Sequence, residues 1–238
     1  SSAASDVYKR QGHEDTPDDP SYVKETGHPA YRADDALWLF PTIYKYIAES
    51  GNIGFIDEVI PFANKDEGTV YEHLKRAIDF SMNRLGDNGM PAGLHADWND
   101  CLRLGKNGES SFVAMQLYYA FTIMRKFAEK KNDTEYISYL DKTQKDIGEK
   151  INKLWWEDDR FNRGFKETGE LIGSKKDPEA SMWLNPQTWS VISGLATREQ
   201  ADKAMASVDR ELNTAYGAKI MAPSYVDLSL IHISEPTR

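Results

Sequence analysis

The segment Gly93-Leu-His-Ala-Asp-Trp-Asn-Asp-Cys-Leu-Arg-Leu-Gly105 is the stretch that organises this chain. Its centre, Asp97-Trp-Asn-Asp100, places two carboxylates, an amide and an indole next to one another. Glycines stand at both ends, and Met90-Pro-Ala92 leads into the segment. A polar cluster framed by residues that break helices predicts a structured loop rather than the interior of a helix.

Two interpretations of this loop are open from its residues alone. In the first, Asp97, Asn99 and Asp100 are ordinary turn formers and Trp98 anchors the core. In the second, the loop is part of a sugar site, where a flat aromatic ring covers the C–H face of the sugar and carboxylates serve its hydroxyls and its glycosidic oxygen. The pairing of an aromatic residue with carboxylates is what speaks for the second interpretation.

The loop resembles the catalytic loop of the inverting disaccharide phosphorylases of glycoside hydrolase family 94, which include cellobiose and chitobiose phosphorylases. Two further stretches match the same family in the same order along the chain. They are Arg32-Ala-Asp-Asp-Ala-Leu-Trp-Leu39 and Trp183-Leu-Asn-Pro-Gln-Thr-Trp-Ser-Val-Ile-Ser-Gly194. Three matches in order are more specific than one tetrapeptide.

The resemblance implies roles for two residues of the loop. The second Asp of the motif is the general acid in that family, which is Asp100 here, and Trp98 lines the site of the transferred sugar. Asp97 is a candidate substrate-binding residue that could serve sugar hydroxyls or only hold the loop. His95 and Arg103 flank the motif, and the spacing assigns them no role.

The chemistry expected from the loop is phosphorolysis. An inverting hydrolase needs one carboxylic acid for the leaving oxygen and a second carboxylate to activate water. A phosphorolytic enzyme needs only the first, because phosphate is itself an anionic nucleophile. Asp100 would protonate the glycosidic oxygen while phosphate attacks C1 from the opposite face, which gives a sugar 1-phosphate. Inorganic phosphate is then a co-substrate, and no cofactor or metal is expected; the family's phosphate-binding His and Thr lie further along its chain.

Composition excludes several other classes of protein. The formal charge is −9 and no basic cluster occurs, which argues against a nucleic-acid partner. The most apolar stretch, residues 36–48, is interrupted by Pro41 and Lys45 and is too short to span a membrane. The single cysteine, Cys101, excludes an intrachain disulfide and fits a reducing compartment, so we expect a cytoplasmic protein.

The helical pattern predicts an all-α fold with one small β-hairpin. The hairpin is expected between Arg160 and Ile172, with its turn at residues 167–170. Helix starts are expected at Asp34 or Asp35, Thr69, Ser110 or Ser111, Asp133, Asn185-Pro186 and Thr197. One helix carries its apolar face on Val113, Leu117, Phe121, Met124 and Ala128.

The resemblance implies that these helices form part of an (α/α)6 barrel. We expect such an open half-barrel to leave helix faces such as 113–128 uncovered. Gln187, with Asn185, could reach the pocket from the start of its helix, although packing by Trp183 and Trp189 explains the same stretch.

The two ends do not resemble the rest of the chain. Residues 1–11 and 228–238 are similar to translated sequencing adapters, so we exclude them from the fold. Residues 12–227 are then expected to be an internal fragment of the catalytic domain, from a protein that continues in both directions.

Three hypotheses stay open at this point. The first is a fragment of a phosphorylase that acts on an oligosaccharide and phosphate, whose full-length form is a homodimer. The second is a glycoside hydrolase of similar fold that uses water. The third is a non-catalytic helical or carbohydrate-binding module.

Overall fold

Helix α5 (Ser111–Lys131) is the centre of the fold in the computed structural model, which describes residues 32–62, 66–99 and 102–226. Ser110 caps the helix by accepting a hydrogen bond from the backbone N–H of Val113 at 3.3 Å. Asn132, in the left-handed conformation, ends it. The predicted apolar face from Val113 to Ala128 is fully buried, so the expectation that it would be uncovered is wrong.

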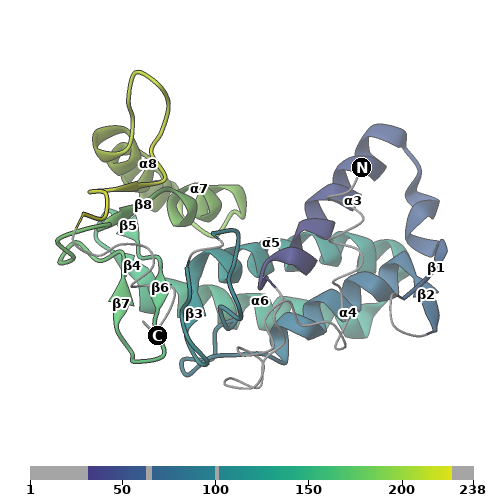
Figure 1. Ribbon diagram of the computed structural model, residues 1–238. Helices are drawn as coiled ribbons and strands as arrows, with labels where there is room; N and C mark the ends of the chain where they lie inside the picture. Colours follow the sequence, from purple (N-terminus) through teal and green to yellow (C-terminus); the bar gives the residue numbers. More distant parts are fainter. Residues whose placement is uncertain (1–31, 63–65, 100–101, 227–238) are drawn as a thin grey trace.

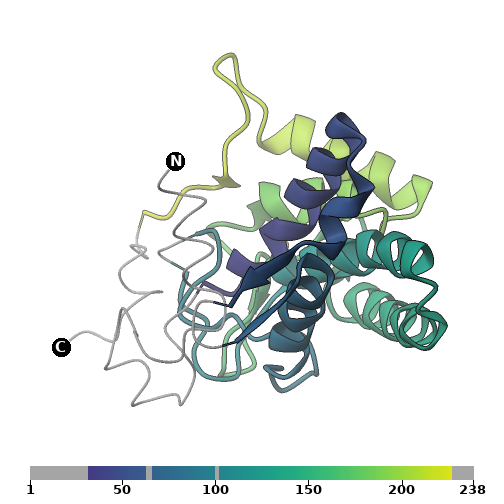
Figure 2. The same ribbon diagram turned by 90° about the vertical axis from the view of Figure 1, so that its right-hand side faces the viewer.

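Neighbouring helices cover α5 on both sides. In Figure 1, α3 and α7 lie above α5, and α4 and α6 lie below it; Figure 2 shows α5 and α6 side by side. α8 packs against α7 and so lies on the side of α5 opposite to α4 and α6 in Figure 1. The helices are η1 (Asp35–Trp38), α3 (Leu39–Ser50), η2 (Ile53–Asp57), α4 (Val70–Met82), α6 (Thr134–Trp155), α7 (Leu184–Ile192) and α8 (Arg198–Glu211).

The N-cap patterns in the sequence predicted most of the helix starts correctly. Thr69 and Thr197 each form a complete capping box at the start of α4 and α8, as predicted. The start predicted at Asn185-Pro186 is wrong, because α7 begins at Leu184. Trp183 belongs to a strand that pairs with Met221, so the extended backbone passes directly into the helix.

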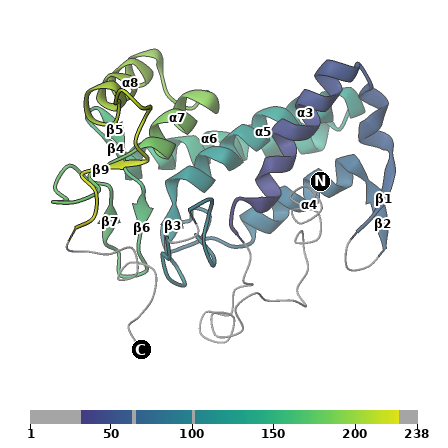
Figure 3. The same cartoon turned by 45° about the horizontal axis from the view of Figure 1, so that its top comes forward.

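The predicted hairpin is confirmed, and further short strands accompany it. β6 (Gly164–Phe165) pairs antiparallel with β7 (Leu171–Ile172), and β3 (Glu109–Ser110) joins the other edge of β6. Figure 3 shows these strands at the end of α5 where α7 and α8 lie. The other strands are β1 (Val59–Pro61), β2 (Glu67–Thr69), β4 (Trp156–Glu157), β5 (Arg160–Phe161), β8 (Met182–Trp183) and β9 (Met221–Ala222). The fold is mostly helical with small sheets rather than all-α with one hairpin.

No helix in the described parts of the chain is long and apolar enough to cross a membrane.

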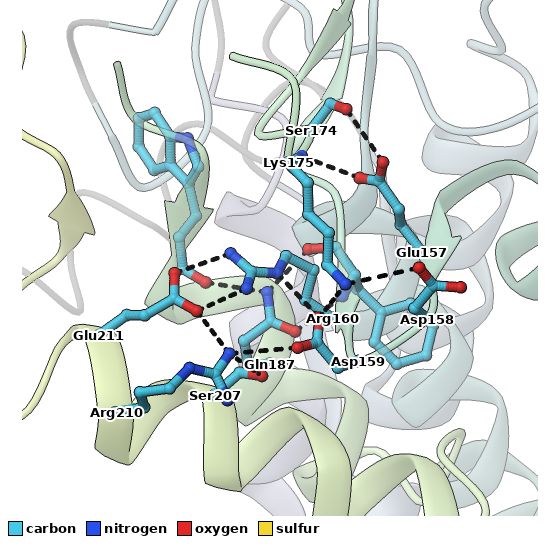
Figure 4. Close-up of polar contacts among 12 residues, drawn as sticks. Glu157, Asp158, Asp159, Arg160, Ser174, Lys175, Gln187, Ser207, Arg210 and Glu211 are labelled. Atoms are coloured by element: carbon cyan, nitrogen blue, oxygen red, sulfur yellow. Dashed lines mark hydrogen bonds and ion pairs between the residues drawn. The ribbon is translucent and has the colours of Figure 1, made fainter. Parts of the chain in front are cut away.

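An ion-pair network fastens α8 to the β4–β5 hairpin (Figure 4). The buried guanidinium of Arg160 donates to both carboxylate oxygens of Glu211, at 2.8 and 2.5 Å, and to Asp159 at 3.1 Å. Burial alone would raise the pKa of Asp159, but hydrogen bonds from Lys175, Arg160 and Ser207 outweigh it and hold that pKa well below its usual range.

Replacing Arg160 should therefore loosen α8 from the hairpin. Arg160→Met removes the buried cation that contacts both oxygens of Glu211 and leaves the more exposed Arg210 as the only arginine shared by Glu211 and Asp159 among the described residues. We expect a loss of about 2 kcal/mol in the free energy of unfolding by urea near pH 7. Arg160 is one of the groups that hold the pKa values of Asp159 and Glu211 below their usual range, so its removal weakens this effect. The difference between the two proteins should thus be constant above about pH 5 and shrink as the pH falls below about 4.

Arg198→Ala is the matched control, since Arg198 forms an exposed ion pair with Asp202 on the same helix. It should cost no more than about 0.5 kcal/mol. Equal losses for the two variants, or a difference from the wild type that does not change with pH, would contradict this role for Arg160.

Candidate active site

Backbone hydrogen bonds fix the loop between Gly93 and Gly105. Gly93 N–H donates to the carbonyl of Gly108 at 2.9 Å, and Ala33 N–H donates to the carbonyl of Ala96 at 2.8 Å. Gly105 ends the loop with φ of +83°, a conformation that residues with a side chain rarely adopt. The described residues of the segment, 93–99 and 102–105, form no helix, as predicted for a loop, and Ala96 lies beside the chain that leads into η1.

Asp97 is held inside the protein by Arg163. One guanidinium nitrogen of Arg163 contacts both carboxylate oxygens of Asp97, at 2.7 and 2.5 Å, and each side chain is 1% exposed. Ser110 donates its hydroxyl to the same carboxylate at 2.7 Å, and the Asn99 backbone N–H donates to it at 2.9 Å. This geometry favours the second role predicted for Asp97, that of holding the loop; contact with a sugar stays a prediction.

Arg163 is a residue that the sequence analysis missed as part of the site. It lies between β5 and β6, with its other terminal nitrogen 2.9 Å from the Ser110 hydroxyl. A signal was present in the sequence, because Arg163 alternates with Phe161 and Phe165 in the predicted hairpin. An arginine that shares an apolar alternation faces the interior and requires a buried carboxylate.

Trp98 lies at the surface of the loop. Its side chain is 50% exposed, so the interpretation of Trp98 as a core anchor is wrong. An indole that is half covered by protein presents an apolar face to solvent, as a sugar platform must. Its role in lining a sugar site stays a prediction.

The proposed general acid, Asp100, lies outside the described residues, as does Cys101. The residues on either side are placed: Asn99 is bound by the Asp97 carboxylate, and Leu102 N–H donates to the Asn99 carbonyl at 2.9 Å. The structure therefore shows the contacts of Asn99 and Leu102, on either side of residues 100 and 101, and the role of Asp100 stays a prediction.

His95 and Arg103 meet across the loop. The Arg103 guanidinium donates to Nδ1 of His95 at 3.1 Å. Gln187, by contrast, does not face a pocket. Its amide is buried and bonds both the N–H and the carbonyl of Phe161, at 2.8 and 2.7 Å, so packing accounts for Gln187, while the role of Asn185 stays a prediction.

Asp34 does not act as the helix cap that its position predicted. Its side chain makes no capping hydrogen bond and instead accepts one from the indole N–H of Trp38 at 2.7 Å. Burial raises the pKa of Asp34 to about 7, the Trp38 hydrogen bond opposes this shift, and the charges of Asp97 and Asp35 add to it. A second buried carboxyl group thus lies close to the loop.

Within the described ranges, no group of three or more His, Cys, Asp or Glu side chains could hold a metal ion.

The sequence is similar to one family and to several characterised proteins. The profile of the Glycosyl hydrolase 94 superfamily catalytic domain matches residues 4–235, which includes most of both terminal segments. N,N'-diacetylchitobiose phosphorylase of Vibrio proteolyticus is 39% identical over 198 residues, which are 81% of this chain and 24% of that protein. Solabiose phosphorylase of Paenibacillus borealis is 32% identical, over 84% of this chain and 26% of that protein. The chain thus spans about a quarter of the length of these relatives.

Two solved structures share the fold at low sequence identity. A rhamnosidase from Klebsiella oxytoca with rhamnose bound matches 76% of this chain and 31% of its own, with a TM-score of 0.54 and 12% identity. A GH78 family rhamnosidase of Bacillus sp. GL1 matches 76% of this chain and 18% of its own, with a TM-score of 0.58 and 15% identity.

The Asp97–Arg163 pair should be a large contributor to the stability of the loop. Removing one partner of a buried pair leaves the other charge uncompensated, so Arg163→Met and Asp97→Asn should each lower the free energy of unfolding by about 3–5 kcal/mol. The double variant should recover part of that loss, because it leaves no unpaired charge. Urea unfolding of the four proteins measures the coupling.

Arg125→Met serves as the surface control, since Arg125 pairs with Asp141 and Glu129 in an exposed position. It should cost less than about 1 kcal/mol. Single losses at Asp97 and Arg163 that simply add in the double variant would show that the two side chains do not act as a pair.

Proposed function

Because the chain belongs to the Glycosyl hydrolase 94 superfamily, we propose that its parent protein is an inverting phosphorylase of a β-linked disaccharide or oligosaccharide. The observation that carries this proposal is the motif Asp97-Trp-Asn-Asp100 on a loop anchored by a buried ion pair, in a chain related to several disaccharide phosphorylases. These relatives are named for different disaccharides, so we propose only the class of substrate, a β-linked disaccharide or oligosaccharide.

The helices α3 to α8 would form one sector of an (α/α)6 barrel. Its inner ring would take α3, α5 and α7, and its outer ring α4, α6 and α8. The likeness to the rhamnosidase structures supports this arrangement. Residues 12–227 would then be a fragment of the catalytic domain, with the loop at one rim. The complete protein would be a homodimer and would supply the remaining helices and the phosphate site.

Asp100 is the proposed proton donor. Phosphate oxygen attacks C1 of the sugar while the bond from C1 to the glycosidic oxygen breaks, and the proton of Asp100 goes to that oxygen. Attack from the face opposite the leaving sugar inverts C1, so a β-linked substrate gives an α-sugar 1-phosphate and a free acceptor sugar. Trp98 would carry the apolar face of the transferred sugar.

The pairing of Asp97 supports the choice of Asp100 over Asp97. Both oxygens of the Asp97 carboxylate already accept hydrogen bonds inside the protein, from Arg163, Ser110 and the Asn99 N–H. Asp97 would instead keep the backbone of Asn99 in place, through the hydrogen bond from its N–H. In this proposal Asp100 donates the proton, and Asp97 holds the backbone that leads to it.

Hydrolysis is the alternative reaction on the same fold. The rhamnosidase matches share the fold alone and do not bear on the nucleophile, whereas the relatives at 32–39% identity are phosphorylases. Cleavage that does not depend on phosphate would favour a hydrolase. A complete protein that binds sugar without cleaving it would favour a carbohydrate-binding module.

The proton donor can be tested in the complete protein with two substrates. Asp100→Asn keeps the shape of the side chain but cannot give a proton, so turnover of the natural disaccharide with phosphate should fall about 10²–10⁴-fold. The matching β-glycosyl fluoride, whose leaving group needs no proton, should lose far less. Release of sugar 1-phosphate measures both reactions.

Asp87→Asn is the control, because it makes the same change at an exposed position ahead of the loop. It should leave both rates unchanged. Equal losses on the two substrates in Asp100→Asn would remove Asp100 from the role of proton donor.

The 238-residue chain by itself should not catalyse phosphorolysis, since it spans about a quarter of the related phosphorylases. Purified chain, incubated with cellobiose or diacetylchitobiose and phosphate, should release no sugar 1-phosphate above a buffer blank. Robust phosphate-dependent release would show that these residues contain a complete site.

A further inference from the structure

We propose that Asp34 is a positioning residue for Asp97 and the segment 93–99: it carries a proton in the working enzyme, and loss of that proton displaces Asp97 and the backbone of Asn99 that Asp97 holds. The catalytic consequence rests on the proposed function; the protonation of Asp34 does not.

The chain around Asp34 is bound directly to the loop. Arg32 forms backbone bridges with Leu94 and Ala96, and Ala33 N–H donates to the Ala96 carbonyl. Asp34 is the next residue on one segment, and Asp97 is the next residue on the other. Repulsion between the Asp34 and Asp97 side chains would therefore act directly on the backbone pairing between residues 32–33 and 94–96.

The Asp34 carboxyl group lies in a place that suits an acid better than an anion. The residue is 3% exposed, and only one of its oxygens, Oδ2, receives a hydrogen bond, from Trp38. The other oxygen, Oδ1, is shut off from water and has no hydrogen-bond partner within the described residues. A buried anion with one oxygen unpaired is costly, and a proton on that oxygen removes the cost.

Trp38 keeps Asp34 from turning away. The Trp38 ring meets the ring of Trp189 in α7 edge to face, with centroids 5.5 Å apart. Trp189 in turn contacts Phe112 and Tyr119 of α5. The indole that holds Oδ2 is thus part of the packing between α7 and the start of α3.

The charged groups around Asp34 are unfavourable to its anion. Asp97 faces it from the loop and Asp35 from its own turn, and both raise its pKa in addition to burial. In the part of the chain that the structure describes, no cation is among the groups that shift the pKa of Asp34, and the guanidinium of Arg163 contacts both oxygens of Asp97 instead. Arg103 of the loop is hydrogen-bonded to His95. With its pKa at about 7, Asp34 changes charge in the range where the enzyme would work.

The sign of the effect on stability follows from the direction of this shift. The folded protein keeps the proton of Asp34 up to about pH 7, while the unfolded chain loses it near the ordinary value of 3.8. Stability supplied by this proton is full below about pH 4, declines as the pH rises to about 7, and is absent above that.

Asp34→Asn is the decisive variant, because the amide imitates the protonated acid and still accepts from Trp38. In urea unfolding of the 238-residue chain from pH 4 to pH 8, the unfolding equilibrium constant of the wild type should rise relative to that of Asp34→Asn, on the order of a hundredfold or more over this range. Asp87→Asn should show no such trend. A ratio that is constant with pH would overturn the proposal.

A titration of the wild type covers the case in which Asp34→Asn does not fold. The ¹³C NMR signals of the aspartate carboxyl carbons should include one that titrates near pH 7. If every aspartate signal titrates below pH 5, Asp34 is not the proton carrier and the proposal fails.

The complete enzyme tests the positioning role. The kcat/KM for disaccharide and phosphate should fall in the wild type as the pH rises through about 7, and Asp34→Asn should move this decline to higher pH. A uniform change in rate with an unmoved pH profile would show a merely structural residue and overturn the positioning role. If the wild type releases no sugar 1-phosphate at any pH, the proposed function fails, while the unfolding and NMR results still decide whether Asp34 holds its proton.

Discussion

The contact between Arg163 and Asp97 is the interaction on which the candidate site depends. Both side chains are almost fully buried, and the carboxylate also receives the Ser110 hydroxyl and the Asn99 backbone N–H. A charge pair in this setting stabilises only when its geometry is complete, and here the hydrogen bonds to Asp97 complete it. The hairpin that carries Arg163 and the helix that begins after Ser110 are thereby fixed to the residues around Trp98.

The helices provide the rigid frame for this contact. Ser110 has two functions, since it caps α5 and donates to Asp97, which ties the start of the central helix to the loop. Glu109, the residue before it, is buried and accepts from the N–H groups of Asn88 and Met90, which holds the approach to the loop. Through Ser110, helix α5 thus holds Asp97, the residue before the exposed Trp98.

Local sequence patterns predicted the elements better than the contacts between them. The sequence predicted the capping boxes at Thr69 and Thr197 and the hairpin turn around Gly169, because each depends on residues a few positions apart. The partner of Asp97 lies 66 residues away, and no local rule identifies it. Asp34 has the residue type of a cap, but its carboxylate binds Trp38 because the short 3-10 helix η1 brings that indole over it. Most of the strands have two residues, which is too short for an alternation of apolar and polar side chains to predict them.

The central claim is that this loop serves an inverting attack by phosphate rather than by water. The most direct measurement is the configuration of the product released by the complete protein, followed by ¹H and ³¹P NMR during cleavage of a β-linked disaccharide with phosphate. The claim predicts an α-sugar 1-phosphate as the first product. A β-sugar 1-phosphate, or a free sugar formed at the same rate without phosphate, would contradict it.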